Sequence, residues 1–212
     1  MSGKRGAKQR TRRASAVDRF FIIEIVLFYS LQKHIETAEP SIQAGTTAVV
    51  AYLKGNRSFV ANAGDSRCVL GGRRADGSVR ALRVTVDHKP SLPAEEARIK
   101  AAGGFVTRTR IKRGEISRVC AILGVARALG DPMLQPMVTC MPDVFDFKVD
   151  EHEVMILACD GLWDVVEDDE AMAVCYASEN AGEAALRLRN LAFARNSDDN
   201  VSVLVVFFVD TL

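Results

Sequence analysis

Three aspartates stand where an apolar segment meets glycine or polar residues, and such positions can hold a metal ion. Asp65 follows Gly64, Asp160 precedes Gly161, and Asp199 lies just before the last apolar segment. A strand holds a carboxylate in place, and an adjacent glycine leaves room for ligand and solvent. Hard cations such as Mg²⁺ and Mn²⁺ prefer carboxylate and water oxygens. The pattern is compatible with a divalent-metal site, but an Asp-Gly pair at the end of a strand is more often only a turn, so the spacing alone does not establish one.

Cysteine and histidine offer no competing chemistry. The five cysteines are Cys68, Cys120, Cys140, Cys159 and Cys175. Their number is odd and they form no Cys-x-x-Cys pair, which excludes a disulfide framework and a zinc cluster. The three histidines are scattered, so we expect no histidine metal site. Small buried thiols are typical of a reducing compartment, and we therefore expect the chain in the cytoplasm or nucleus.

The basic residues gather at one end of the chain. Lysine and arginine number 28 and aspartate and glutamate 27, but six of the basic residues and no acid fall within the first 16 positions. We interpret residues 1–17 as a disordered, solvated tail. An address signal, an anion-binding patch and an organellar transit peptide are the alternatives. The rest of the chain is mildly acidic, and no nucleic-acid partner is expected.

Phe20–Leu31 is the strongest apolar run, and it contains Glu24. Twelve residues with an internal charge are too few to span a bilayer, so no membrane span is expected. No small-residue cleavage site follows, which argues against a signal peptide. We favour a buried strand that continues into a helix. The alternative is that residues 20–27 are already the start of that helix, because periodicity does not separate the two for a short apolar run.

Short β-rich runs dominate the first half of the chain, and helical patterns come late. Strands are predicted over 46–53, 57–63, 67–70, 144–149, 154–158 and 200–209, and helices from Pro93 and over 168–177 and 182–194. Residues 104–118 are basic and aperiodic, and we predict a loop or flap there. Hairpin-type turns outnumber crossover connections, which favours an α+β fold with antiparallel sheets.

Seven segments, in order along the chain, resemble the motifs of the type 2C metal-dependent protein serine/threonine phosphatases. They are residues 44–48, 62–67, 87–90, 95–104, 123–131, 160–165 and 197–200. The resemblance covers about residues 41–209. Seven matches in the family's order are far more specific than any one of them.

The resemblance implies an antiparallel β-sandwich flanked by helices, incomplete at its N-terminal end, over residues 18–212. It implies dephosphorylation of phosphoserine and phosphothreonine in proteins, with Mg²⁺ or Mn²⁺ as cofactor and a phosphoprotein substrate or a regulatory protein as partner. Asp160 and Asp199 match ligands of one ion, and Asp65 matches an acid of a third, weaker ion. Arg127 and Asp131 match a structural segment, where an arginine–carboxylate pair would pin the root of the flap.

One motif of that family is missing. The family's first strand ends in Asp-Gly-His-Gly-Gly, whose aspartate bridges two ions, and this sequence contains no such segment. Glu24 lies in the corresponding region without flanking glycines. Two alternatives to an active phosphatase follow: a pseudophosphatase that acts as a binding or regulatory module, and a shortened form of an active enzyme. No catalytic or substrate-binding residue is assigned.

Overall fold

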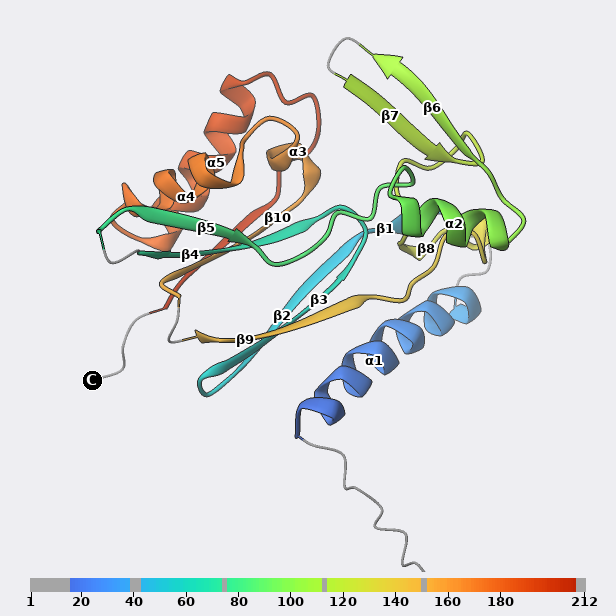
Figure 1. The fold of residues 1–212 in the computed structure, drawn as a ribbon, viewed down its shortest axis with the longest axis horizontal. Helices are drawn as coiled ribbons and strands as arrows, with labels where there is room; N and C mark the ends of the chain where they lie inside the picture. Colours follow the sequence, from blue (N-terminus) through green and yellow to red (C-terminus); the bar gives the residue numbers. More distant parts are fainter. Residues whose placement is uncertain (1–15, 39–42, 74–75, 112–113, 150–151, 209–212) are drawn as a thin grey trace, which may run out of the picture.

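Two antiparallel sheets stacked face to face form the body of the molecule (Figure 1). The computed structural model describes residues 16–38, 43–73, 76–111, 114–149 and 152–208. The strand orders are β2-β3-β9 in one sheet and β11-β10-β4-β5 in the other. These strands are β2 (Ala48–Lys54), β3 (Arg57–Ala63), β4 (Arg67–Arg73), β5 (Val79–Arg83), β9 (Asp143–Lys148), β10 (Val154–Ala158) and β11 (Val203–Phe207).

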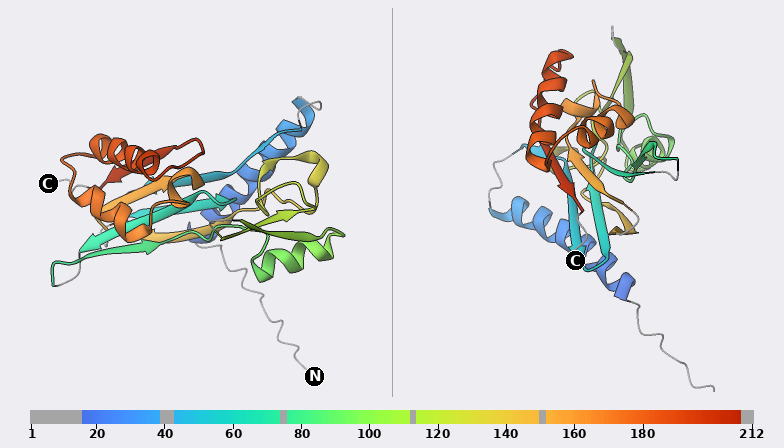
Figure 2. Two further views of the ribbon diagram at one scale, coloured as in Figure 1. Left: turned by 90° about the horizontal axis from the view of Figure 1, so that it is seen from above. Right: turned by 90° about the vertical axis from the view of Figure 1, so that its left-hand side faces the viewer.

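Helices cover the outer faces of both sheets, and two small sheets complete the fold (Figure 2). The helices are α1 (Ala16–Ala38), α2 (Pro93–Ala101), α3 (Asp160–Trp163), α4 (Asp168–Tyr176) and α5 (Ala181–Ala194), with a 3₁₀ turn at Pro132–Leu134. The small sheets pair β1 (Gly45–Thr46) with β8 (Leu129–Gly130), and β6 (Val106–Ile111) with β7 (Gly114–Val119).

The central strands are buried on both faces, which explains their continuous apolar sequences. In β10, Ile156 packs towards α4 and α5, whereas Leu157 packs into the space between the two sheets. In β3, Val60 faces that same inner space, and Ala61 packs against Phe28 of α1. This alternation confirms the α+β sandwich flanked by helices that the sequence predicted.

Residues 20–27 are helical, so the favoured strand was wrong and the alternative, the start of a helix, was right. They belong to α1, which runs for 23 residues. Phe28, Gln32 and Ile35 recur at helical spacing on the side of α1 that faces the sheet. Gln32 fixes the helix to β8, because its side chain accepts a hydrogen bond from the N–H of Gly130 at 2.8 Å. The apolar run could not reveal this, since a short apolar segment fits helix and strand alike.

The basic stretch 104–118 is a β-hairpin, so the prediction of an irregular loop was wrong. Strands β6 and β7 pair from Val106 opposite Val119 to Ile111 opposite Gly114. Arginines alternate with β-branched residues along β6, and this alternation suits an exposed two-stranded ribbon. The hairpin projects away from the sandwich (Figure 1).

Helix α1 begins at Ala16, so the last two residues of the predicted basic tail, Ala16 and Val17, are helical. Residues 1–15 lie outside the described ranges, so the predicted disorder of the tail stays a prediction. None of the helices in the described ranges is long and apolar enough to cross a membrane.

Candidate metal centre

Asp65 lies in the tight turn between β3 and β4 at one end of the sandwich. Its side chain is buried, with 4% of the residue exposed. Gly64 adopts a φ of +112°, and a Cβ there would come within 2.4 Å of the Thr47 side chain. Only glycine fits this turn, and the close packing of Thr47 fixes the position of the neighbouring carboxylate.

His88 holds this turn from the other side. The Gly64 N–H donates to His88 Nδ1 at 3.2 Å, and the His88 N–H donates to the Gly64 carbonyl at 3.0 Å. Since Nδ1 accepts, Nε2 carries the proton and donates to Asp143 at 3.1 Å. His88 is therefore a structural residue, and it positions Asp65 through Gly64.

Asp160 and Asp164 lie one helical turn apart at the start and the end of α3. The Asp164 N–H donates to the Asp160 carbonyl at 2.8 Å, so both side chains leave the same side of the turn. The sequence analysis did not select Asp164. The i,i+4 spacing of the two acids after an apolar strand was the signal for it.

The loop that carries Asp199 packs directly against α3. A Cβ on Gly161 would lie 2.2 Å from the Asn200 carbonyl oxygen, so glycine is required for this close approach. The Ser197 hydroxyl donates to the Gly161 carbonyl at 2.7 Å, and the Cys159 N–H donates to Ser202 at 3.2 Å. These bonds bring the Asp199 loop beside the segment that carries Asp160.

The carboxylates at this end repel one another, and Lys89 offsets part of the repulsion. Burial and the charges of Asp65, Asp164 and Asp199 raise the pKa of Asp160, while Lys89 acts to lower it. Burial also raises the pKa of Asp164 against the effect of Lys89. The Lys89 ammonium forms an ion pair with Asp65. A cationic side chain therefore already stands among the acids that the sequence assigned to a metal.

The donor chemistry of this end fits a hard divalent cation. Asp65, Asp160, Asp164 and Asp199 offer carboxylate oxygens, and their mutual repulsion is the condition that a bound cation relieves. Over the described ranges, however, no three His, Cys, Asp or Glu side chains form a cluster ready to hold a metal. The assignment of Asp65, Asp160 and Asp199 as ligands thus stays a prediction, and ligation would require Lys89 to move.

An arginine–carboxylate network stands beside the site, at the root of the hairpin. Arg127 donates to Glu95 at 2.6 and 2.9 Å and to Asp143 at 2.8 Å. Arg98 donates to the other oxygen of Glu95 at 2.8 Å. The expected structural arginine pair is present, but its acids are Glu95 and Asp143, whereas Asp131 packs next to Gly45.

A second network fixes the base of the site. Arg67 is buried, with its guanidinium 5.0 Å from the centre of the Trp163 ring. It donates to Asp87 at 3.0 Å and to Asp168 at 2.6 Å. Burial opposes the charge of Arg67, but the two carboxylates more than compensate and raise its pKa. Trp163 donates to the Ala158 carbonyl at 3.0 Å and packs in the core.

The buried cysteines Cys68 and Cys175 are poor nucleophiles. All five are free thiols, and three of them are buried. Burial raises the pKa of Cys68 and of Cys175 to about 12, so neither carries a thiolate at neutral pH.

Comparison with known proteins identifies the family of this chain. The sequence model described as Protein phosphatase 2C matches residues 11–201. Probable protein phosphatase 2C 59 of Arabidopsis thaliana is 44% identical over 171 residues, which are 79% of this chain and 51% of that protein. Probable protein phosphatase 2C 68 of Oryza sativa is 43% identical over 169 residues, or 76% of this chain and 44% of that one. The chain thus spans about half the length of these two curated relatives.

Comparison with solved structures shows the same architecture. A serine-threonine phosphatase 2C from Toxoplasma gondii superposes with a TM-score of 0.80 at 27% identity, covering 95% of this chain and 72% of that one. A sex-determining protein from C. elegans gives a TM-score of 0.73 at 26% identity, over 94% of this chain and 48% of that one. On the family match, the sequence identities and the shared architecture, this chain belongs to the protein phosphatase 2C family.

Proposed function

We propose that the chain is a metal-dependent protein phosphatase domain that acts on phosphoserine and phosphothreonine in proteins. One observation supports this most: the charges of Asp65, Asp164 and Asp199 all act on Asp160 and help to raise its pKa, at one end of a protein phosphatase 2C sandwich. Phosphate monoester hydrolysis needs an activated water and relief of phosphoryl charge, and a divalent ion such as Mg²⁺ or Mn²⁺ supplies both when bound.

The chain's own residues would position that ion. Asp160 and Asp199 would hold it from two adjoining segments, because Gly161 and Ser197 fix the Asp199 loop against α3. The turn at Gly64 fixes Asp65 through its bonds to His88. Lys89, displaced from Asp65 by the ion, would be left with its positive charge beside the site, where it would attract a phosphate group.

A second candidate function is that of a pseudophosphatase, which binds phosphoproteins or regulates them without turnover. Two observations favour it. The sequence contains no Asp-Gly-His-Gly-Gly segment, so the acid that bridges two ions in the resembling enzymes has no counterpart. Lys89 already neutralises Asp65. With one ion at most, we expect turnover lower by several orders of magnitude, since each ~1.4 kcal/mol of lost transition-state stabilisation is tenfold in rate.

Manganese-dependent hydrolysis of a phosphothreonine peptide by the full chain separates the two functions. Turnover that Asp160→Asn abolishes and that Asp146→Asn, on β9 in an ion pair with Arg57, leaves unchanged would support the phosphatase. Absence of turnover, together with peptide binding in a separate titration, would support the pseudophosphatase. Turnover that survives Asp160→Asn would contradict the proposed site.

We propose a cytoplasmic or nuclear location, which the five free thiols support. Reporter fusions of the full chain, with and without residues 1–15, would test it. Uptake into an organelle that depends on residues 1–15 would favour the transit-peptide alternative.

A further inference from the structure

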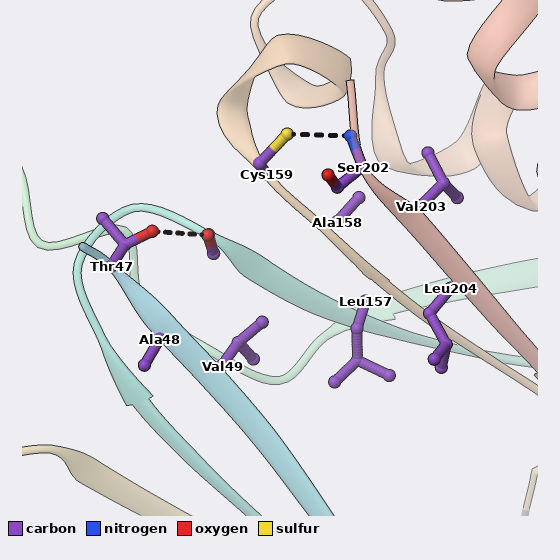
Figure 3. A pocket seen from close by; sticks show the side chains of 10 residues that line it. Thr47, Ala48, Val49, Leu157, Ala158, Cys159, Ser202, Val203 and Leu204 are labelled. Carbon is purple, nitrogen blue, oxygen red and sulfur yellow. Dashed lines mark hydrogen bonds between the residues drawn. The ribbon is translucent and has the colours of Figure 1, made fainter. Parts of the chain in front are cut away.

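An apolar groove of about 380 Å³ opens between the two sheets, next to the acidic end. Its walls come from β2 on one side and from the ends of β10 and β11 on the other. Val49, Leu157 and Leu204 face the same space in Figure 3. Leu204 is 55% exposed, a large fraction for a leucine on a strand of the sandwich. The groove shows that this side of the sandwich is not closed over the described residues.

The edge of β11 beside this groove presents unpaired backbone groups. In the described part of the chain, β11 pairs only with β10. Phe208 donates to Glu153, and Cys159 donates to Ser202, so Ser202, Leu204, Val206 and Phe208 are the residues that bond towards β10. An antiparallel strand bonds to each side through alternate residues. The N–H and C=O groups of the residues between, Val203, Val205 and Phe207, therefore point outwards.

The β11 edge lacks the usual protection against pairing. Exposed sheet edges normally carry charges or prolines, which prevent another strand from adding. Among the edge strands of the two described sheets, β5 carries two arginines, β9 carries three charged residues and β2 ends in a lysine. Strand β11 reads Val-Leu-Val-Val-Phe and has neither charge nor proline. Its edge is suited to be covered by a strand that is itself uncharged and apolar.

We propose that β11 pairs with β11 of a second copy of this chain. A two-fold axis at Val205 places Val205 opposite its own copy and Val203 opposite Phe207 of the partner. The two-fold axis repeats the pair of Val203 and Phe207, which makes three pairs in all. Every residue in these pairs faces outwards, so each pair exchanges two hydrogen bonds in an antiparallel ladder. Leu204 then lies opposite Val206 of the partner, which covers its exposed face. An uncharged strand meets no repulsion from its own copy, and the two-fold contact closes at the dimer.

The oligomeric state and the exchange of individual amides test this pairing together. We expect the full chain to sediment as a dimer at rising protein concentration. The Val203, Val205 and Phe207 amides should exchange with deuterium at least tenfold more slowly at high concentration than at low. The Leu204 and Val206 amides, bonded to β10 in either state, should be equally protected at both.

Two variants make the test specific. Leu204→Lys places a charge at the dimer interface and should raise the dimer dissociation constant at least tenfold. Leu186 on α5 is similarly exposed, and Leu186→Lys should leave the dissociation constant unchanged. Val205→Pro removes one outward N–H without removing a bond to β10, and should also give a monomer. Circular dichroism checks that each variant folds.

Four outcomes overturn the proposal. They are a monomer at every concentration, a dimer that Leu204→Lys leaves unchanged, a dimer without new protection in β11, and an assembly that keeps growing with concentration. A chain that stays monomeric but binds an added apolar peptide along β11 also contradicts the proposal, because the strand edge would then bind a different partner.

Discussion

The two sides of the acidic end of the sandwich are built very differently. On one side, the Asp65 turn, α3 and the Asp199 loop are held by glycines in close contact and by side-chain bonds to the backbone. On the other side, β2 and β11 border an open apolar groove, and Leu204 is exposed. The first side positions carboxylates. The second has apolar side chains and unpaired strand edges.

The candidate metal site is therefore built from only the first of these two sides. Every acid that the structure brings together comes from the turn after β3, from α3 or from the loop before β11. The sequence contains no Asp-Gly-His-Gly-Gly segment, whose aspartate bridges two ions in the resembling enzymes. One divalent ion is therefore the most that we expect this end to bind.

The largest effect is expected at Glu95, which supports the well-bonded side. Glu95→Ala leaves Arg127 and Arg98 without their shared carboxylate in a buried place. We expect the free energy of unfolding to fall by about 3 kcal/mol, the usual cost of removing one member of a buried ion pair. Urea denaturation measures this, with Glu115→Ala on the exposed hairpin as control. A loss no larger than that of the control would contradict the structural role of the network.

The same network has a predictable pH dependence. Burial acts to raise the pKa of Glu95, but Arg127 and Arg98 more than compensate and lower it below its ordinary value of 4.5. Its contribution to stability is then fully present above that value and is lost as the pH falls through the lower, folded-state pKa. The difference between the native chain and Glu95→Ala should therefore shrink in acid. A difference that stays constant down to the lowest pH at which the chain folds would argue against this pairing.

Lys89→Met tests whether the lysine competes with a cation. Removing the ammonium leaves the carboxylates unbalanced, so the metal-free protein should melt at a lower temperature. Divalent cations should bind about tenfold more tightly, which corresponds to ~1.4 kcal/mol. Thermal melting with and without Mn²⁺ measures both effects, and Lys100→Met on α2 is the control. Unchanged Mn²⁺ affinity in Lys89→Met would show that the lysine does not obstruct the site.

Asp160→Asn should have a smaller and opposite effect on the metal-free protein. The folded-state pKa of Asp160 is raised, chiefly by burial. Its ionised form is therefore disfavoured in the folded state, and stability falls as the pH rises from the ordinary pKa through the raised one. The amide removes this cost, so Asp160→Asn should raise the melting temperature at neutral pH. A lower melting temperature would mean that the carboxylate stabilises the fold.

The smallest effect is expected far from the site, at the exposed pair of Arg57 and Asp146. Arg57 lies on β3 and Asp146 on β9, and the arginine side chain is 45% exposed. Arg57→Ala should change the free energy of unfolding by less than ~1 kcal/mol, as is usual for exposed ion pairs. A larger loss in urea denaturation would show that stability is more evenly spread between the two regions than we infer.

The sequence predicted two of the strands at their observed bounds but not the extent of the first helix. Strands 57–63 and 154–158 were predicted at their observed bounds, because both are apolar segments between strong turn signals. The segment 20–27 was mistaken for a strand, because only tertiary packing decides the conformation of a short apolar run. The site was predicted in part. Asp164 was missed because the short helix that pairs it with Asp160 was not anticipated, and the Lys89–Asp65 pair depends on distant segments that meet only in the fold.

Titration of the full chain with Mn²⁺ by calorimetry tests the one-sided site most directly. We expect one binding site, which Asp160→Asn removes and Asp146→Asn does not. Two tight sites in the native chain, or Mn²⁺ binding that persists in Asp160→Asn, would contradict it.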